Sequence, residues 1–210
     1  MKRAVTLATP HGPLPCTLTL PEAPVGLALL ATPPDGPVPA LAETLHAQQL
    51  AVLTPELLSP REQHFPDTLH NVSLLTERLL LALEFADRDG DTAGLPVGIY
   101  ASAPLAPAAI RAAARRDAQV AALVCHGGVI DLAGLQYLEL LAVPLLMVFD
   151  AEDGVGPPAF RRATPHLHGY WQELRLAPGE TGFTIVASWF QAHPGKRQPP
   201  RFTLADGEPD

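Results

Sequence analysis

Predicted strands alternate with helical patterns along most of this 210-residue chain, and this alternation restricts the fold more than any other feature. The predicted strands cover residues 25–31, 50–54, 95–100, 120–125, 143–149 and 170–177. The predicted helices cover residues 38–49, 69–86, 105–116, 134–141, 157–166 and 182–193. Short apolar runs between helical segments are typical of parallel strands joined by crossover helices. The sequence therefore predicts a mostly parallel α/β sheet with helices on both faces.

The first 20 residues follow a different pattern. Residues 4–9 and 14–20 flank the turn-rich segment Pro10–Pro13, which predicts two antiparallel strands in a hairpin. With this hairpin the predicted sheet has eight strands. We expect one domain over residues 1–193, followed by a tail over 194–210 that is rich in proline and charge. In that tail, Phe202 and Leu204 could pack as a short strand or lie loose.

Composition and charge exclude several classes of function. The chain has 22 acidic and 14 basic residues and no large basic cluster, so we expect no nucleic-acid binding. The apolar run at 25–31 is too short to span a bilayer, so we expect no membrane contact. Cys16 and Cys125 lie far apart in the sequence, so we expect reduced thiols and a cytoplasmic protein. His166 and His168 lack a third ligand, which predicts no metal site. No glycine-rich phosphate loop is present, and we expect no cofactor.

Four stretches of sequence, together with the order of the predicted elements, resemble a known superfamily. They are Pro24–Leu30, Leu57–Glu62, Leu74–Leu80 and Leu145–Asp153. Over about residues 14–193 the chain resembles the α/β-hydrolase superfamily, and within it the dienelactone-hydrolase-like proteins. The resemblance implies an eight-stranded α/β-hydrolase fold with a ligand site beyond the carboxyl ends of the strands. The alternative is an unrelated doubly wound α/β protein.

The resemblance implies a nucleophile on a sharp turn after a strand, in a Gly-x-Ser-x-Gly elbow. Counted from Gly98, the nucleophile position is Ala103, which has no reactive group. Ser102 lies one residue early, and a shifted elbow would place Tyr100 and Pro104 where glycines normally stand. Ser102 is therefore either a helix cap or a displaced nucleophile.

The acid and the base of a triad have expected positions as well. Asp153 follows the strand at 143–149 and matches the position of the acid, and Asp150 and Glu152 lie close enough to take that position after a small error of register. Asp153 could instead cap the next helix. The resemblance implies a histidine before the last helix, but that position holds Thr181 or Gly182, and neither can accept a proton at neutral pH.

The oxyanion loop is expected after the strand at 25–31, where a backbone N–H should stabilise negative charge. This loop includes Thr32, Pro33 and Pro34, and prolines have no N–H to donate. The nucleophile, the base and the oxyanion donor of the serine-hydrolase mechanism are thus all absent from their expected positions.

Three functions remain open. The first is a dienelactone-hydrolase-like protein that has lost acyl-transfer chemistry and whose pocket binds a small ligand. The second is an active esterase or lactonase with Ser102 as nucleophile, His126 as base and Asp153 as acid, because His126 ends a strand at the same sheet edge. The third is a non-enzymatic interaction protein. Formation of a homodimer is open under each.

Overall fold

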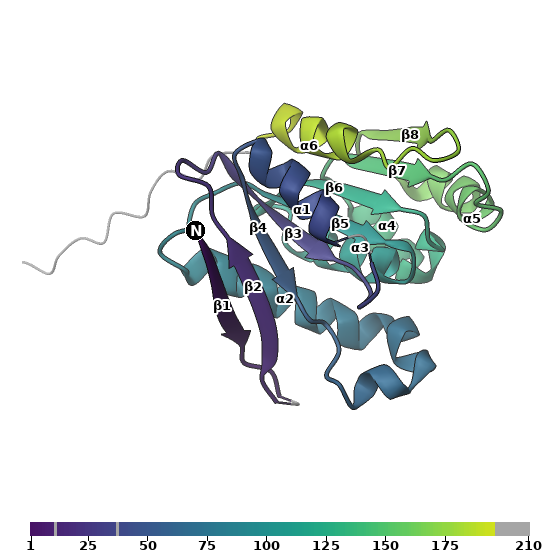
Figure 1. Cartoon of the computed structure of the whole chain (residues 1–210). Coiled ribbons are helices and arrows are strands. Elements are labelled where there is room, and N and C mark those ends of the chain that lie inside the picture. Colours follow the sequence, from purple (N-terminus) through teal and green to yellow (C-terminus); the bar gives the residue numbers. More distant parts are fainter. Residues whose placement is uncertain (11, 37, 196–210) are drawn as a thin grey trace, which may run out of the picture.

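A computed structural model describes residues 1–10, 12–36 and 38–195. The described strands form one eight-stranded sheet in the order β1-β2-β4-β3-β5-β6-β7-β8 (Figure 1). Their bounds are β1 Lys2–Leu7, β2 Leu14–Thr19, β3 Gly26–Ala31, β4 Leu50–Pro55, β5 Val97–Ser102, β6 Val120–His126, β7 Leu145–Phe149 and β8 Trp171–Arg175. β2 pairs antiparallel with β1 and β4, and the other pairs are parallel. The predicted mostly parallel sheet with an antiparallel first hairpin is confirmed.

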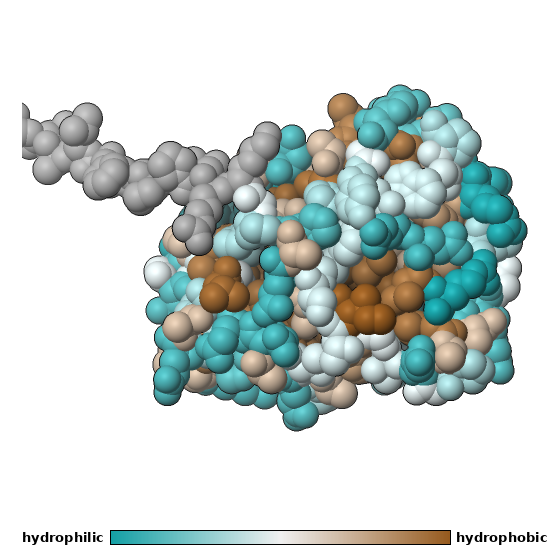
Figure 2. All heavy atoms as spheres, turned by 90° about the horizontal axis from the view of Figure 1, so that it is seen from above, coloured by the Kyte–Doolittle hydropathy of each residue, from teal (hydrophilic) through white to brown (hydrophobic). Residues whose placement is uncertain are grey.

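Helices cover both faces of the sheet, as predicted. They are α1 Val38–Ala47, α2 Val72–Arg88, α3 Ala106–Arg115, α4 Leu135–Leu140, α5 Gly156–Ala163 and α6 Phe183–Ala192. Short 3₁₀ helices connect them: η1 Glu62–His64, η2 Pro66–His70, η3 Ala103–Leu105, η4 Ile130–Ala133 and η5 Thr164–His166. Buried side chains of α1 and α6 pack on one face, and those of α2 to α5 pack on the other. Figure 2 views the molecule from the side of α6, where hydrophobic atoms form patches between hydrophilic ones.

The central strands are buried on both faces because helices cover both sides of them. Every residue of β3 and β7 is buried, which explains why these strands appear in the sequence as continuous apolar runs. β8 is an edge strand with mostly exposed side chains, so its sequence lacks such a run.

The structure differs from the predicted boundaries mainly before α2. The helix predicted from residue 69 begins at Val72, because the Asn71 side chain accepts a hydrogen bond from the N–H of Leu74 at 3.1 Å and caps the helix there. The residues before it, Pro66–His70, form η2 instead. This segment lies beside the candidate site.

None of the helices in the described ranges is long and apolar enough to cross a membrane. Phe202 and Leu204 lie outside the described residues, so the interpretation of the tail stays a prediction.

Candidate functional site

The turn after β5 determines what stands at the nucleophile position. β5 ends at Ser102, and η3 begins at Ala103, which is exposed and lines a cavity of about 460 Å³. Ser102 is still extended strand, in register with His126, and its Oγ is buried without a hydrogen-bond partner. Ser102 does not line this cavity. The methyl group of Ala103 therefore faces the space where an α/β-hydrolase nucleophile would stand.

Pro104 adds a feature that the sequence reasoning missed. In hydrolases of this type one oxyanion donor is the backbone N–H of the residue after the nucleophile. Here that residue is proline, which has no N–H. Proline suits the first turn of a helix, where its fixed φ is already helical. A proline directly after the elbow position was the sequence signal that could have revealed the loss.

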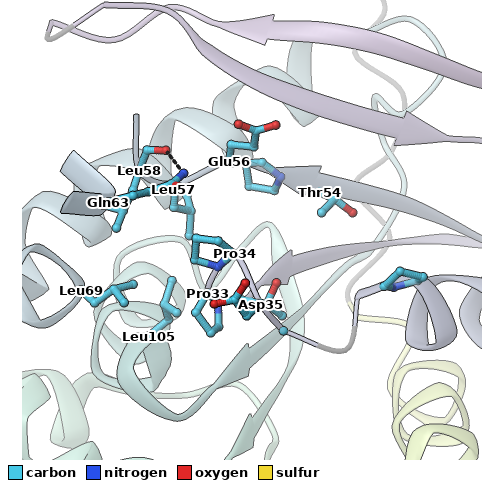
Figure 3. Close-up of a pocket in the computed structure, with 14 residues that line it drawn as sticks. Pro33, Pro34, Asp35, Thr54, Glu56, Leu57, Leu58, Gln63, Leu69 and Leu105 are labelled. Atoms are coloured by element: carbon cyan, nitrogen blue, oxygen red, sulfur yellow. Dashed lines mark hydrogen bonds between the residues drawn. The ribbon is translucent and has the colours of Figure 1, made fainter. Parts of the chain in front are cut away.

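The loop expected to give the second oxyanion donor lines a separate cavity of about 490 Å³ (Figure 3). Thr32, Pro33 and Pro34 line it together with residues that follow β4, such as Leu57 and Leu58. The prolines in this loop have no N–H to donate. Prolines therefore stand both after the elbow and in the loop after β3, the two places that normally supply the N–H groups for an oxyanion.

His126 ends β6 and makes two hydrogen bonds. Its Nδ1 lies 2.9 Å from the hydroxyl of Tyr100, and its Nε2 lies 2.9 Å from Oδ1 of Asp150. A carboxylate only accepts, so Nε2 carries the hydrogen, and the neutral ring accepts at Nδ1. Burial, aided by the charge of Asp150, raises the pKa of Tyr100, so its hydroxyl keeps the hydrogen that it donates. The imidazole is held between a phenol and a carboxylate.

Asp153 caps a helix. Its Oδ1 accepts hydrogen bonds from the N–H groups of Val155 at 2.9 Å and Gly156 at 2.8 Å, at the start of α5. Its Oδ2 lies over Gly127, where an added Cβ would be 3.3 Å from that oxygen and 3.7 Å from the Cβ of Ala103. Asp153 and Ala103 thus flank the same point at the end of β6.

The hydrogen bonds of a Ser102–His126–Asp153 set are not made in this structure. His126 pairs with Asp150, Asp153 binds backbone N–H groups, and Ser102 Oγ has no partner. The structure brings His126 and Asp153 to one cavity, and it leaves Ser102 outside. The sequence reasoning missed the link from Tyr100 to His126. A sequence signal was available, because Tyr100 lies two residues before Ser102 in one strand. Its side chain therefore faces the same side of the sheet as that of Ser102.

The position predicted for the base, Thr181 or Gly182, belongs to neither of the two cavities. Thr181 is exposed, and Gly182 is the N-cap residue directly before α6, with a φ of +66°, a conformation that favours glycine.

The 3₁₀ helices η2 and η3 contact each other, and both contribute lining residues to each of the two cavities. Leu69 lines the cavity of 490 Å³, and the next residue, His70, lines that of 460 Å³. Neither set of lining residues contains a lysine or an arginine, and each contains two carboxylates: Asp35 and Glu56, or Asp150 and Asp153. Within the described residues, no group of three His, Cys, Asp or Glu side chains could hold a metal ion.

A buried ion pair holds the connection between β4 and α2, which forms a wall of the 490 Å³ cavity. Arg78 is 2% exposed and donates to Glu62 Oε1 at 2.7 Å, to Glu62 Oε2 at 3.0 Å and to the carbonyl of Leu57. Ser59 donates to Glu62 through its hydroxyl at 2.7 Å and its N–H at 2.8 Å. These donors, Arg78 above all, lower the pKa of Glu62 to about 2.

No protein-family model matches the chain. Proteins of two Mycobacterium tuberculosis strains, each named "Putative phosphoribosyl transferase", are 33% identical to it over 177 residues. The match covers 81% of this chain and 40% of those proteins, so the chain spans about two fifths of the length of the curated relatives it matches.

Solved structures are similar over nearly the whole chain. A dienelactone hydrolase from Anabaena variabilis is 26% identical with a TM-score of 0.83, covering 92% of this chain and 98% of that one. Est1E from Butyrivibrio proteoclasticus is 12% identical with a TM-score of 0.70, covering 88% and 94%. Together with the strand order, these likenesses show that the chain belongs to the α/β-hydrolase fold. Within that fold, it is dienelactone-hydrolase-like.

Proposed function

We propose that this dienelactone-hydrolase-like protein binds a small ligand beyond the carboxyl ends of its strands and does not transfer acyl groups through a Ser-His-Asp triad. One observation carries the proposal. Ala103 stands at the elbow, exposed to a cavity of about 460 Å³, while the hydroxyl of Ser102 is buried outside that cavity. This volume lies within the range of about 300–1,000 Å³ that is typical of small-molecule sites.

The surroundings of the elbow support the same proposal. Pro104 and the prolines after β3 remove N–H groups that would stabilise an oxyanion, and Gly182 or Thr181 replaces the base. Loss of the nucleophile or base alone lowers turnover by a factor on the order of a million in a serine protease. A protein without both therefore has no effective route to acyl transfer by this mechanism.

An active esterase that uses Ser102 is the main competing function. Ser102 would have to leave its pairing in β5, where it is in register with His126, before its Oγ could reach a substrate in the cavity. A pure interaction protein is the third function, and it differs from the proposed one because it needs no ligand in the cavity.

Phosphoribosyl transfer, the activity in the name of the Mycobacterium tuberculosis relatives, would require a site that binds phosphate groups. Phosphate groups are usually bound by arginine, lysine or clustered backbone N–H groups. The residues that line the two described cavities include no lysine or arginine. The two cavities thus lack the cationic side chains that usually bind a phosphate.

We expect no covalent labelling of the purified protein by a fluorophosphonate probe, which reacts with activated serines. Ser102→Ala should behave like the wild type, and an active serine esterase treated in parallel should be labelled. Ala103→Ser should stay unlabelled as well, since a serine there would meet no base and no oxyanion donor. Labelling of the wild type that disappears in Ser102→Ala would establish the competing hydrolase.

A further inference from the structure

The sheet ends on β8, and one side of this strand has no neighbouring strand in the described ranges (Figure 1). At its start, the N–H of Leu145 donates to the carbonyl of Tyr170 at 2.9 Å. At its end, the N–H of Leu176 donates to the carbonyl of Phe149 at 2.9 Å. Because backbone groups alternate between the two sides of a strand, every second residue of β8 turns its N–H and carbonyl away from β7. These residues are Trp171, Glu173 and Arg175.

The free edge of β8 lacks the usual features that keep strand edges apart. Such edges are commonly blocked by proline, by a bulge or by charged side chains. β8 contains no proline and pairs with β7 in continuous register. Its two charges have opposite signs, and Arg175 Nε lies 3.2 Å from Glu173 Oε1 on the same face of the strand. This pattern repels an edge of one charge but complements the same pattern in reverse order, which an antiparallel copy of β8 presents.

A second copy of β8 fits this edge in one antiparallel register. When Leu174 lies opposite Leu174 of the second copy, Glu173 lies opposite its Arg175, and Arg175 lies opposite its Glu173. Glu173 and Arg175 both turn their backbone groups outward, so each of these two pairs can exchange two backbone hydrogen bonds. Opposite charges directly across an antiparallel pair are stabilising. A register shifted by one pair would place Glu173 opposite itself, and like charges in that position are destabilising.

The other face of the same edge is apolar. Leu174 is partly buried and packs against the core cluster under α1 and α6. Tyr170, directly before β8, is 54% exposed, and its ring stacks on Trp189 of α6 with the centroids 5.9 Å apart. Ile185 lies one turn before Trp189 on the same face of α6 and is 41% exposed. A second copy at β8 would therefore cover apolar side chains as well as backbone groups.

The opposite edge of the sheet, β1, does not have this pattern. Its charged residues are Lys2 and Arg3, which are both basic, and Arg3 already pairs with Asp89 of the same chain. An antiparallel copy of β1 would bring only further positive charge to it. The two edges of the sheet thus differ in their ability to pair with themselves.

We propose that two copies of this chain associate through β8, antiparallel and with Leu174 at the two-fold axis, so that one sheet runs through both copies. The interface lies away from the residues that line the two cavities, and the inference does not depend on the proposed function.

The first test changes the charges of the edge. Light scattering at about 100 μM should give the wild type twice the 22.3 kDa mass of one chain. Glu173→Arg and Arg175→Glu should each shift the dissociation midpoint about tenfold or more to higher concentration, because each places like charges opposite one another. An equal mixture of the two variants should recover the dimer, since opposite charges then face each other, and this recovery shows that both are folded. Lys2→Glu, on β1, is the matched control and should behave like the wild type.

The second test reports the register. Leu174→Cys should form a disulfide between two chains under mild oxidation, because its copy lies directly opposite. Gln172→Cys, on the same face, is the control and should not, since its copy would lie about 13 Å away along the strand. Cys16 and Cys125 are buried in the chain itself.

Three outcomes would overturn the inference. They are a wild type with the mass of one chain at every concentration up to about 100 μM, a dimer that neither β8 charge variant weakens, and a dimer that Lys2→Glu weakens instead. Cross-linking of Gln172→Cys in place of Leu174→Cys would overturn the register.

Discussion

At the scale of single residues, His126 shows how neighbours fix the state of a side chain. Tyr100 donates to its Nδ1 from a fully buried position, and Asp150 accepts from its Nε2. The lone pair of Nδ1, through which a general base would accept a proton, is thereby occupied by the Tyr100 hydroxyl. The sequence placed His126 at the end of a strand, at the same sheet edge as Ser102 and Asp153, but its hydrogen-bond partners come from β5 and the end of β7.

We expect the neutral ring of His126 to be the Nε2–H tautomer. His193 provides a control in the same molecule, because its Nδ1 lies 2.9 Å from the carbonyl of Trp189 and must donate there. Long-range ¹H–¹⁵N spectra should show opposite tautomers for the two rings. Tyr100→Phe should weaken the preference at His126 and lower the free energy of unfolding by about 1 kcal/mol. An Nδ1–H tautomer at His126 in the wild type would contradict the assigned hydrogen bonds.

At the scale of elements, the connection from β4 to α2 depends on a pair that joins two of the stretches behind the family resemblance. Glu62 lies in η1 and Arg78 lies in α2, so the pair ties the loop to the helix behind it. Arg78 is buried, and its charge depends on Glu62 for compensation. The wall of the 490 Å³ cavity is thus built on this pair.

Glu62→Gln should lower the free energy of unfolding at pH 7 by about 3 kcal/mol, because it leaves the Arg78 charge buried without a partner. The folded pKa of Glu62 is about 2, below the ordinary value of 4.5. Its contribution is therefore complete above about pH 4.5 and is lost as the pH falls toward 2. Urea unfolding of wild type and variant should show their difference shrinking between pH 5 and pH 3. The exposed Glu77→Gln, on the same helix, should change little at any pH; a difference that does not depend on pH would argue against the pair.

At the scale of the whole molecule, β5 lies in the middle of the sheet and connects the site to α6. At Gly98, an added Cβ would stand 2.4 to 2.7 Å from the ring of Phe190. Close approach of α6 to the sheet therefore requires glycine at this position. The sheet and α6 are packed so closely that a methyl group added at Gly98 would displace either the helix or the ring of Phe190.

Gly98→Ala should lower the free energy of unfolding by about 2 kcal/mol through overpacking. For a chain of this size, that corresponds to a fall in Tm of roughly 4–8 °C. Gly90→Ala is the control, because an added Cβ there has no atom within 4 Å. Calorimetry on the two variants measures the difference, and equal Tm values would show that α6 does not depend on this contact.

The sequence by itself determined the order of strands and helices, the presence of helices on both faces of the sheet and the alanine at the elbow. These features are local: periodicity reports which side of an element is buried, and the identity of Ala103 or Gly182 shows directly which chemistry is absent. Only the tertiary structure decided that His126 pairs with Asp150, that Asp153 caps α5, and that η2 and η3 line two cavities. Those contacts join side chains from different strands and loops, which meet only when the parallel strands align at one edge of the sheet.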